Sequence, residues 1–244
     1  MREGKGNLSA MLEGLLLVNK PRGVTSHDVV QVVRRKLAVW RIGHTGTLDP
    51  IAEGLLILLV GPSTRYQQAF QAHEKTYEAM LRLGWQTETG DADGTPVRTA
   101  PVPALGQERI AEVLASFRGP LTQTPPAYSA VKVRGRPAYW WARRHQPVTL
   151  APRVIHISEI TLITWTPETI TFRVRCSAGT YIRTMAEAIA ERLGTVGHLD
   201  RLLRLRIGSW SVDEAKPLSW IQDAQPDMIT RQLMPCTSSQ DFTP

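Results

Sequence analysis

The chain has few cysteines, few lysines and no long apolar run. Its only cysteines, Cys176 and Cys236, form neither a disulfide framework nor a zinc-ligand spacing. The six histidines include no pair on one helix face, so no metal site is expected from them. No stretch is long enough to span a membrane, and the apolar run at 15–18 is too short for a signal peptide. A cytoplasmic protein that does not enter membranes is therefore the default expectation.

Arginine supplies 23 of the 29 basic residues, and lysine is correspondingly scarce. The formal net charge is +7 and the sequence pI is about 9.8. Arginine binds phosphate bidentately and stacks on bases, so this excess favours a nucleic-acid partner, although net charge alone does not identify the polyanion. The apolar fraction of 42% supports a sizeable core, and 244 residues suit one large domain or one domain with an appendage.

Strand and helix patterns are mixed along the chain without strict alternation. Apolar periodicity and end signals predict strands at 14–18, 54–60, 76–83, 154–165 and 169–176, and helices at 27–37, 65–72, 108–117 and 184–193. We therefore expect an α+β fold in which a mixed, mostly antiparallel central sheet is flanked by helices and loops.

One carboxylate stands apart in a loop of small residues. Asp49 ends the run Gly43 to Asp49 and precedes Pro50, and its nearest basic neighbours in sequence are Arg41 and Arg65. Glycines in this run permit tight turns, and the proline favours extended geometry at Asp49. The arrangement isolates an acid suited to catalysis. The alternative is an ordinary turn-forming aspartate.

Basic and aromatic side chains interleave between residues 122 and 152. The segment contains arginines at 134, 136, 143 and 144 beside Tyr128, Tyr139, Trp140 and Trp141. Such mixing offers phosphate contacts next to stacking surfaces, which suits looped RNA. The alternative is a short helix that covers the sheet with its tryptophans. Both interpretations can hold for different residues.

Five segments resemble motifs of the TruB-type pseudouridine synthases. The eight residues from Gly43 to Pro50 match the family's catalytic run Gly-His-Thr-Gly-Thr/Ala-Leu-Asp-Pro. In chain order, the family's Lys-Pro-x-Gly motif, tyrosine segment, acidic loop and late motif resemble residues 19–23, 75–77, 89–94 and 176–184. The similarity extends from about residue 12 to about residue 235 and implies the pseudouridine synthase fold.

The resemblance implies isomerisation of the uridine at position 55 in the TΨC loop of tRNA. The bond between C1′ and N1 breaks, the base rotates, and C5 joins C1′, with no cofactor. Asp49 would be the catalytic residue, either as a nucleophile at C1′ or as a base on a sugar proton. The alternative function is a tRNA-binding folding factor whose catalysis is incidental or lost.

Further site residues follow from the same resemblance. Arg183 would pair with Asp49 and keep it ionised, whereas the alternative is a structural ion pair elsewhere. Tyr77 would stack on the extruded uracil, whereas the alternative is a core tyrosine on an alternating strand.

Four more positions complete the expected site. Tyr181 would line the pocket and Leu202 would pack against the base. His44 would contact the RNA near the flipped nucleotide, and Lys20 would support the loop rather than touch substrate.

The resemblance also sets the expected domain organisation and partners. We expect a loose lead-in at 1–12, a catalytic domain at 13–235 and a tail at 236–244. An insertion at about 124–153 would clamp the RNA. The PUA-type RNA-binding module that often follows in this family is expected to be absent or cut off. The expected partner is the TΨC stem-loop of tRNA, bound by a monomer without an obligatory protein partner.

Overall fold

The computed structural model describes residues 12–236, which fall into two compact units. Unit 1 comprises the described residues up to Lys75 and from Leu203 onward, and unit 2 comprises Thr76–Leu202. The strand β12 (Gly197–Ile207) has its first half in unit 2 and its second half in unit 1. The expected lead-in, apart from Leu12, and the expected tail, apart from Cys236, lie outside the described residues.

Unit 1 is built on a small mixed sheet. Its strands are β1 (Gly14–Lys20), β2 (Ile42–His44), β3 (Ala52–Val60), the end of β12, β13 (Trp210–Ser211) and β14 (Lys216–Pro217). β1 pairs antiparallel with β3 from Gly14 opposite Val60 to Lys20 opposite Gly54, while β14 runs parallel to β1. β2 pairs antiparallel with β3 as well, so the residues after β2 must turn back before β3 begins.

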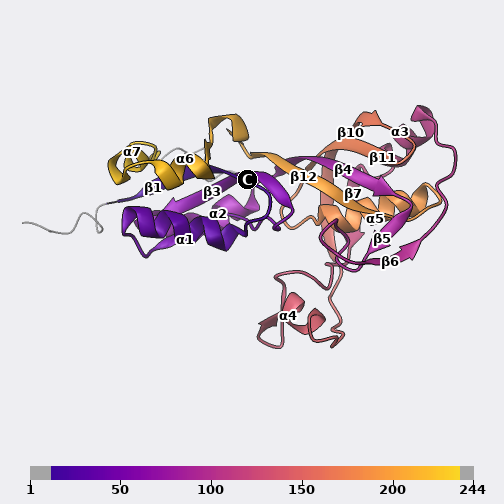
Figure 1. Ribbon diagram of the computed structural model, residues 1–244, viewed down its shortest axis with the longest axis horizontal. Helices are drawn as coiled ribbons and strands as arrows, with labels where there is room; N and C mark the ends of the chain where they lie inside the picture. The colour runs from indigo at the N-terminus through magenta and orange to yellow at the C-terminus, as the bar shows by residue number, and fades with distance from the viewer. Residues whose placement is uncertain (1–11, 237–244) are drawn as a thin grey trace, which may run out of the picture. The chain divides into compact units, whose positions relative to one another are not determined.

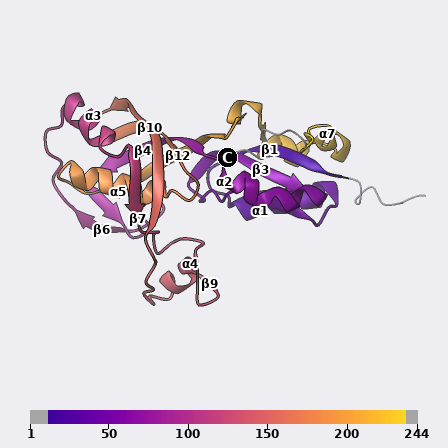
Figure 2. The same ribbon diagram turned by 180° about the vertical axis from the view of Figure 1, so that it is seen from behind.

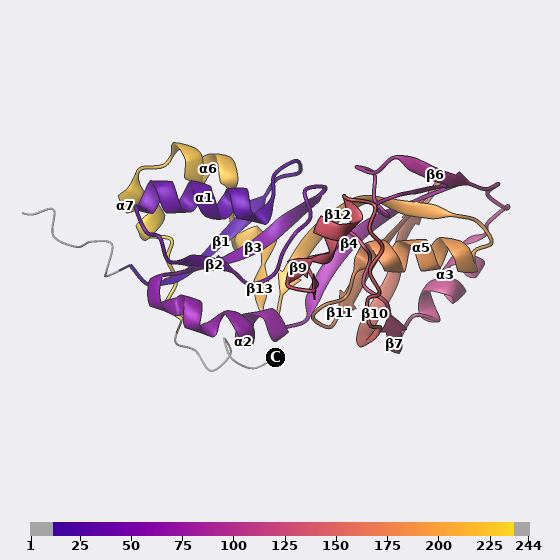
Figure 3. The ribbon, with the colours of Figure 1, turned by 90° about the horizontal axis from the view of Figure 1, so that it is seen from below.

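Helices cover both faces of this sheet (Figure 3). They are α1 (Ser26–Leu37), η2 (Gly61–Tyr66), α2 (Gln67–Ala72), η3 (Val212–Glu214), α6 (Leu218–Asp223) and α7 (Pro226–Thr230). Successive strand residues point to opposite faces, so Leu16 and Val18 pack with α1, α6 and α7. Leu15 and Leu17 belong instead to the core that contains Phe70 of α2. β1 and β3 are buried on both faces, which explains their nearly unbroken apolar runs.

The first helix begins as its sequence signals predict. Thr25 is the N-cap and forms a capping box with Asp28, whose carboxylate also accepts from the Thr25 N–H. This arrangement satisfies amide groups that the first turn would otherwise leave unpaired. The expected apolar stripe, from Val29 to Leu37, is buried in the core of unit 1. The cap therefore fixes the position of the first turn of α1, which contacts the loop that contains Asp49.

Unit 2 contains further strands, with helices around them (Figure 2). Its elements are β4 (Lys75–Leu83), β5 (Trp85–Thr87), β6 (Pro96–Thr99), α3 (Gln107–Ala115), β7 (Gly119–Gln123), β10 (Arg153–Trp165), β11 (Thr169–Cys176) and α5 (Ile182–Arg192). The sheet order is β12-β4-β11-β10-β7, and β10 runs antiparallel to both neighbours. The alternating burial of β4 and β11 matches the predicted strand pattern. With the sheet of unit 1, this confirms the expected α+β class.

The segment between β7 and β10 stands apart from the sheet (Figures 1 and 2). It contains the two-residue strands β8 (Lys132–Val133) and β9 (Arg136–Pro137), followed by the short helix α4 (Ala138–Ala142). Three strand segments lie outside the strands predicted from the sequence. They are the β5–β6 hairpin, the strand β7 that begins at Gly119, and residues 202–207 at the end of β12.

Candidate active site

Asp49 lies in the tight loop between β2 and β3. The Thr45 N–H donates to the Ile57 carbonyl over 3.1 Å, and the Ala52 N–H donates to the Asp49 carbonyl over 3.0 Å. Its apolar neighbours Leu48 and Ile51 are buried, whereas Asp49 itself is half-buried. The buried side chains of Leu48 and Ile51 therefore anchor the loop, while Asp49 remains partly accessible to solvent.

The connection between β1 and α1 fixes the same loop from outside. The Ser26 hydroxyl, in the first turn of α1, accepts from the Leu48 N–H over 2.8 Å and donates to the Leu48 carbonyl over 3.1 Å. The Gly23 N–H donates to the Pro50 carbonyl over 2.8 Å. The residues directly before and after Asp49 are thus both bonded to residues 23–26.

Lys20 adds a buried cation to this connection. Its side chain is fully buried, and Nζ donates to the carbonyls of Val24 at 2.8 Å, Pro21 at 3.0 Å and Pro50 at 3.5 Å. The pKa of Lys20 is lowered to about 8, chiefly by burial and secondly by the charge of Arg204, while the charge of Asp49 opposes this. These contacts fit the supporting role expected for Lys20.

His44 is the residue of β2 that leads into the loop. Burial lowers the pKa of His44, and the charges of Arg204 and His27 act in the same direction. The imidazole is therefore mainly neutral at neutral pH. Its Nδ1 is buried and has no hydrogen-bond partner among residues 12–236.

In unit 2, Arg183 is held by contacts with residues 89–91 and with Tyr128. It lies in the first turn of α5 and is 5% exposed. Nη1 donates to the Thr89 carbonyl and Nη2 to the Tyr128 carbonyl, each over 2.7 Å, and Nε lies 3.6 Å from the Asp91 carboxylate. Asp91 is itself buried and accepts from the Thr89 hydroxyl. The ion pair with Asp91 lies within unit 2, and the expected pairing of Arg183 with Asp49 stays a prediction.

Tyr181 precedes Arg183 as the N-cap of α5. Gln123 of β7 binds its backbone twice: its Oε1 accepts from the Tyr181 N–H over 2.8 Å, and its Nε2 donates to the Tyr181 carbonyl over 3.0 Å. The guanidinium of Arg153 lies 4.8 Å from the centroid of the half-buried Tyr181 ring. Such a cation–π contact leaves a positively charged surface beside an aromatic one.

Tyr77 and Leu202 are both largely buried, at 8% and 9% exposure. Tyr77 belongs to the inward-facing set of β4, together with Ala79 and Leu81. Leu202 ends the part of β12 that belongs to unit 2. Their expected contacts with the base stay predictions.

The insertion around α4 combines guanidinium groups with aromatic rings. The guanidinium carbon of Arg144 lies 3.7 Å from the Trp140 ring centroid, and that of Arg143 lies 5.5 Å from the Tyr139 ring centroid. Both arginines are exposed, while Trp140 is half-buried. The same residues therefore pack against one another and present cations to solvent, and the RNA-binding interpretation of this segment stays a prediction.

Two residues with structural roles were missed from the sequence. Gln123 carries no motif and lies on an edge strand that was not predicted. Arg204 lies two residues after Leu202, so the period of a strand would place it on the same buried face. That periodicity was the only sequence signal that Arg204 is buried. Because arginine is charged, the signal was not recognised.

The part of the chain that the structure describes holds neither a cluster of metal ligands nor a membrane-spanning helix. Within residues 12–236, no three His, Cys, Asp or Glu side chains are grouped as a metal site. Over the same range, no helix is both long enough and apolar enough to cross a membrane.

Comparisons with known proteins show which family this chain resembles. Residues 34–182 match the family model described as TruB family pseudouridylate synthase, N terminal domain. The tRNA pseudouridine synthase B of Hydrogenovibrio crunogenus is 44% identical over 211 residues, which cover 86% of this chain and 70% of that protein. The protein of the same name from Opitutus terrae is 43% identical over 224 residues, covering 92% and 93% respectively.

A solved structure shows the same fold. A chain in the crystal structure of a Cbf5-Nop10-Gar1 complex aligns with a TM-score of 0.70 at 26% identity. The alignment covers 93% of this chain but only 61% of that chain, so the present sequence spans about three fifths of its length.

The family match and the shared fold together define a pseudouridine synthase, an isomerase that acts on RNA. The chain belongs to the TruB family of pseudouridylate synthases. This confirms the family and the fold expected from its motifs.

Proposed function

We propose that this chain converts the uridine at position 55 in the TΨC loop of tRNA into pseudouridine. Family membership and the name shared by its relatives, tRNA pseudouridine synthase B, support the proposal. The bond between C1′ and N1 breaks, the base rotates, and C5 bonds to C1′. C5 then loses its proton and N1 gains one, so the atoms of the nucleoside balance without any added group.

The observation that carries the proposal is the way the Asp49 loop is held. Backbone and side-chain hydrogen bonds fix the residues on both sides of Asp49, and the carboxylate remains half-buried. A preorganised anion avoids the reorganisation that a mobile side chain would need at the moment of reaction. Asp49 acts either as a nucleophile at C1′ or as a base on a sugar proton, and both routes need this fixed carboxylate.

The remaining residues receive the extruded nucleotide. An enzyme that acts on a base takes it out of its stack and holds it between apolar and aromatic side chains. Tyr77 stacks on the uracil, Leu202 packs against it and Tyr181 lines the pocket. Arg183 supplies a fixed guanidinium that pairs with Asp49, His44 contacts the RNA in its neutral form, and Lys20 supports the loop.

The insertion at about 124–153 holds the stem-loop. Its exposed arginines stand beside aromatic rings, an arrangement that suits phosphates next to unstacked bases. The partner is thus the TΨC stem-loop of tRNA. A monomeric state and a cytoplasmic location stay predictions.

A pseudouridine assay on a TΨC stem-loop transcript tests the proposal. Asp49→Asn keeps the shape of the side chain but removes its charge, so product formation should fall by on the order of 10³-fold or more while RNA binding persists. Asp227→Asn, a change at an exposed aspartate, is the matched control and should match wild type. Equal rates for wild type and Asp49→Asn would disprove the role of Asp49. If neither forms product but both bind, the folding-factor function is favoured instead.

A further inference from the structure

Arg204 is a buried arginine to which the proposed reaction assigns no role. It lies in the half of β12 that belongs to unit 1 and is 1% exposed. Nε donates to the Leu55 carbonyl over 2.7 Å, Nη2 to the Gly46 carbonyl over 3.0 Å, and Nη1 to the Thr47 carbonyl over 3.4 Å. Among the residues that the structure describes, no carboxylate forms an ion pair with it.

The three carbonyls lie on two segments that border Asp49. Gly46 and Thr47 belong to the start of the loop, and Leu55 belongs to β3, which follows it. A single guanidinium therefore ties the beginning of the loop to the strand that leaves it. Because the guanidinium is planar and its donors have a fixed geometry, the relative positions of these carbonyls are fixed with it.

Gly54 makes this close approach possible. Its φ is +103°, and a Cβ at this position would lie 2.3 Å from the Arg204 carbonyl oxygen and 2.8 Å from the Arg204 nitrogen. Only glycine combines that backbone conformation with so short a distance to a neighbouring strand. The backbone of β3 is thus shaped to accept Arg204 at this point.

The charge of Arg204 also acts on two titratable groups beside the loop. It lowers the pKa of both Lys20 and His44, while Asp49 raises that of Lys20. A buried cation without a carboxylate partner costs free energy that an apolar side chain of similar volume would avoid. The geometry and this cost together favour a role at the loop over simple packing.

We propose that Arg204 is a positioning residue for the Asp49 carboxylate. It acts through the loop backbone and does not touch the uridine. The inference rests on the proposed function, because it assigns the rate of that reaction to the placement of Asp49. A misplacement of about 1 Å typically lowers a rate on the order of 100-fold.

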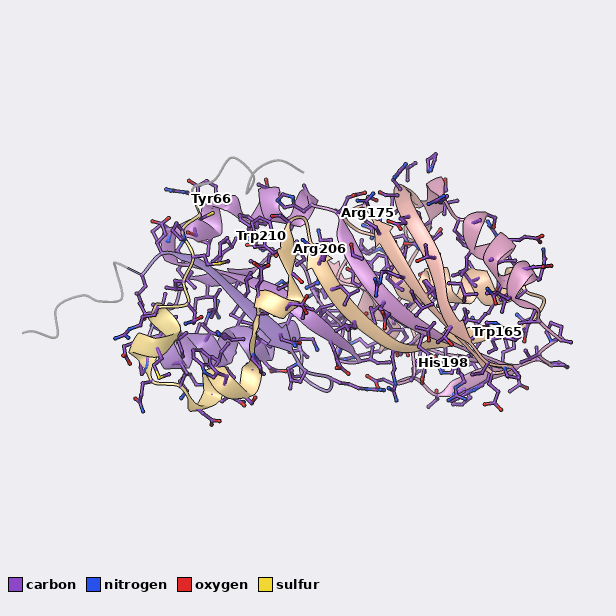
Figure 4. All side chains as sticks on the ribbon, turned by 90° about the horizontal axis from the view of Figure 1, so that it is seen from above. Tyr66, Trp165, Arg175, His198, Arg206 and Trp210 are labelled. Atoms are coloured by element: carbon purple, nitrogen blue, oxygen red, sulfur yellow. The ribbon has the colours of Figure 1, made fainter. Side chains whose placement is uncertain are left out.

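Arg204→Met and Arg204→Lys test the inference, with Arg206→Met as the matched control. Arg206 lies two positions further along the same strand, with an exposed side chain that donates to the Ser209 carbonyl (Figure 4). Three quantities are measured: the single-turnover rate at saturating enzyme, the Kd for the TΨC stem-loop, and the thermal midpoint. Rates are taken at a temperature where circular dichroism shows each variant folded.

Both Arg204 variants should lose about 100-fold in rate with a Kd within threefold of wild type. Lysine keeps the charge, but one ammonium cannot span three carbonyls, so Arg204→Lys should be as slow as Arg204→Met. Arg206→Met should keep the wild-type rate. If Arg204→Met does not fold, Arg204→Lys alone decides.

A wild-type rate for Arg204→Lys would overturn the inference. So would an equal loss in Arg206→Met, or a Kd that rises by the factor by which the rate falls. A wild-type protein that forms no pseudouridine contradicts the proposed function instead, before any variant is compared.

Discussion

Because the buried Lys20 ammonium group titrates, the free energy of unfolding of this protein changes with pH in the alkaline range. Burial lowers the pKa of Lys20 from 10.5 to about 8 in the folded state, while the unfolded chain keeps the ordinary value. Between these two values the unfolded state binds more protons than the folded state. The contribution of Lys20 to the free energy of unfolding therefore rises with pH across this window. It is lowest below pH 8.

The size of the effect follows from the same two values. A change from 10.5 to about 8, at about 1.4 kcal/mol per pH unit, corresponds to about 3 to 4 kcal/mol over the full titration. Lys20 is fully buried, so solvent screening does not reduce this figure in the way it would for a surface charge. Replacing Lys20 with methionine removes the titrating group and leaves carbonyl oxygens, such as that of Val24, without their donor. That second cost does not depend on pH.

Urea unfolding of wild type and Lys20→Met at pH values from 7 to 10.5 measures the effect. The stability of wild type relative to Lys20→Met should increase by about 3 kcal/mol between the ends of this range. Lys132→Met, a change at an exposed lysine, should show a difference that is small and constant. A difference between wild type and Lys20→Met that does not change with pH would refute the reasoning.

Two further predictions concern unit 2. Burial raises the pKa of Glu187, which accepts a hydrogen bond from Gln86, so the folded state binds more protons than the unfolded state just above pH 4.5. Glu187→Gln should therefore have a larger free energy of unfolding in urea than wild type at pH 7, and this gain should shrink toward pH 4. A gain that is the same at both pH values contradicts the prediction. In the insertion, Arg143→Gln with Arg144→Gln should weaken stem-loop binding and reduce the slope of log Kd against log salt by about 2 if both contact phosphate. Filter binding at several salt concentrations tests this against Arg118→Gln; equal slopes for wild type and the double variant would exclude such contacts.

Sequence periodicity predicted the elements whose burial is regular. β4 alternates between buried and half-buried residues over its whole length, and α1 carries both a capping box and an apolar stripe. In these elements local preference and tertiary packing agree, so the pattern alone is sufficient. The Asp49 loop was recognised for another reason, because eight consecutive residues match a known family.

The short edge strands could not be predicted in this way. All four residues of β6 are exposed, and β7 begins with Gly119 and Pro120, which normally indicate a turn. Their strand conformation comes from pairing with β5 and β10, a contact that the local sequence does not encode. Gln123, which fixes Tyr181, was missed because it lies on one of these strands.

Arg204 shows a different limit of prediction from sequence. An arginine in an alternating segment is normally assigned to the exposed face, yet this one is buried because three backbone carbonyls take the place of solvent around it. Lys20 is buried in the same way, and both cations bind the loop through its backbone. A backbone carbonyl is present whatever the side chain, so the amino acids of the loop do not reveal which residues will hold it. The motif identifies the acid, whereas the side chains that fix its position come from β1, α1 and β12 and are found only when the chain is folded.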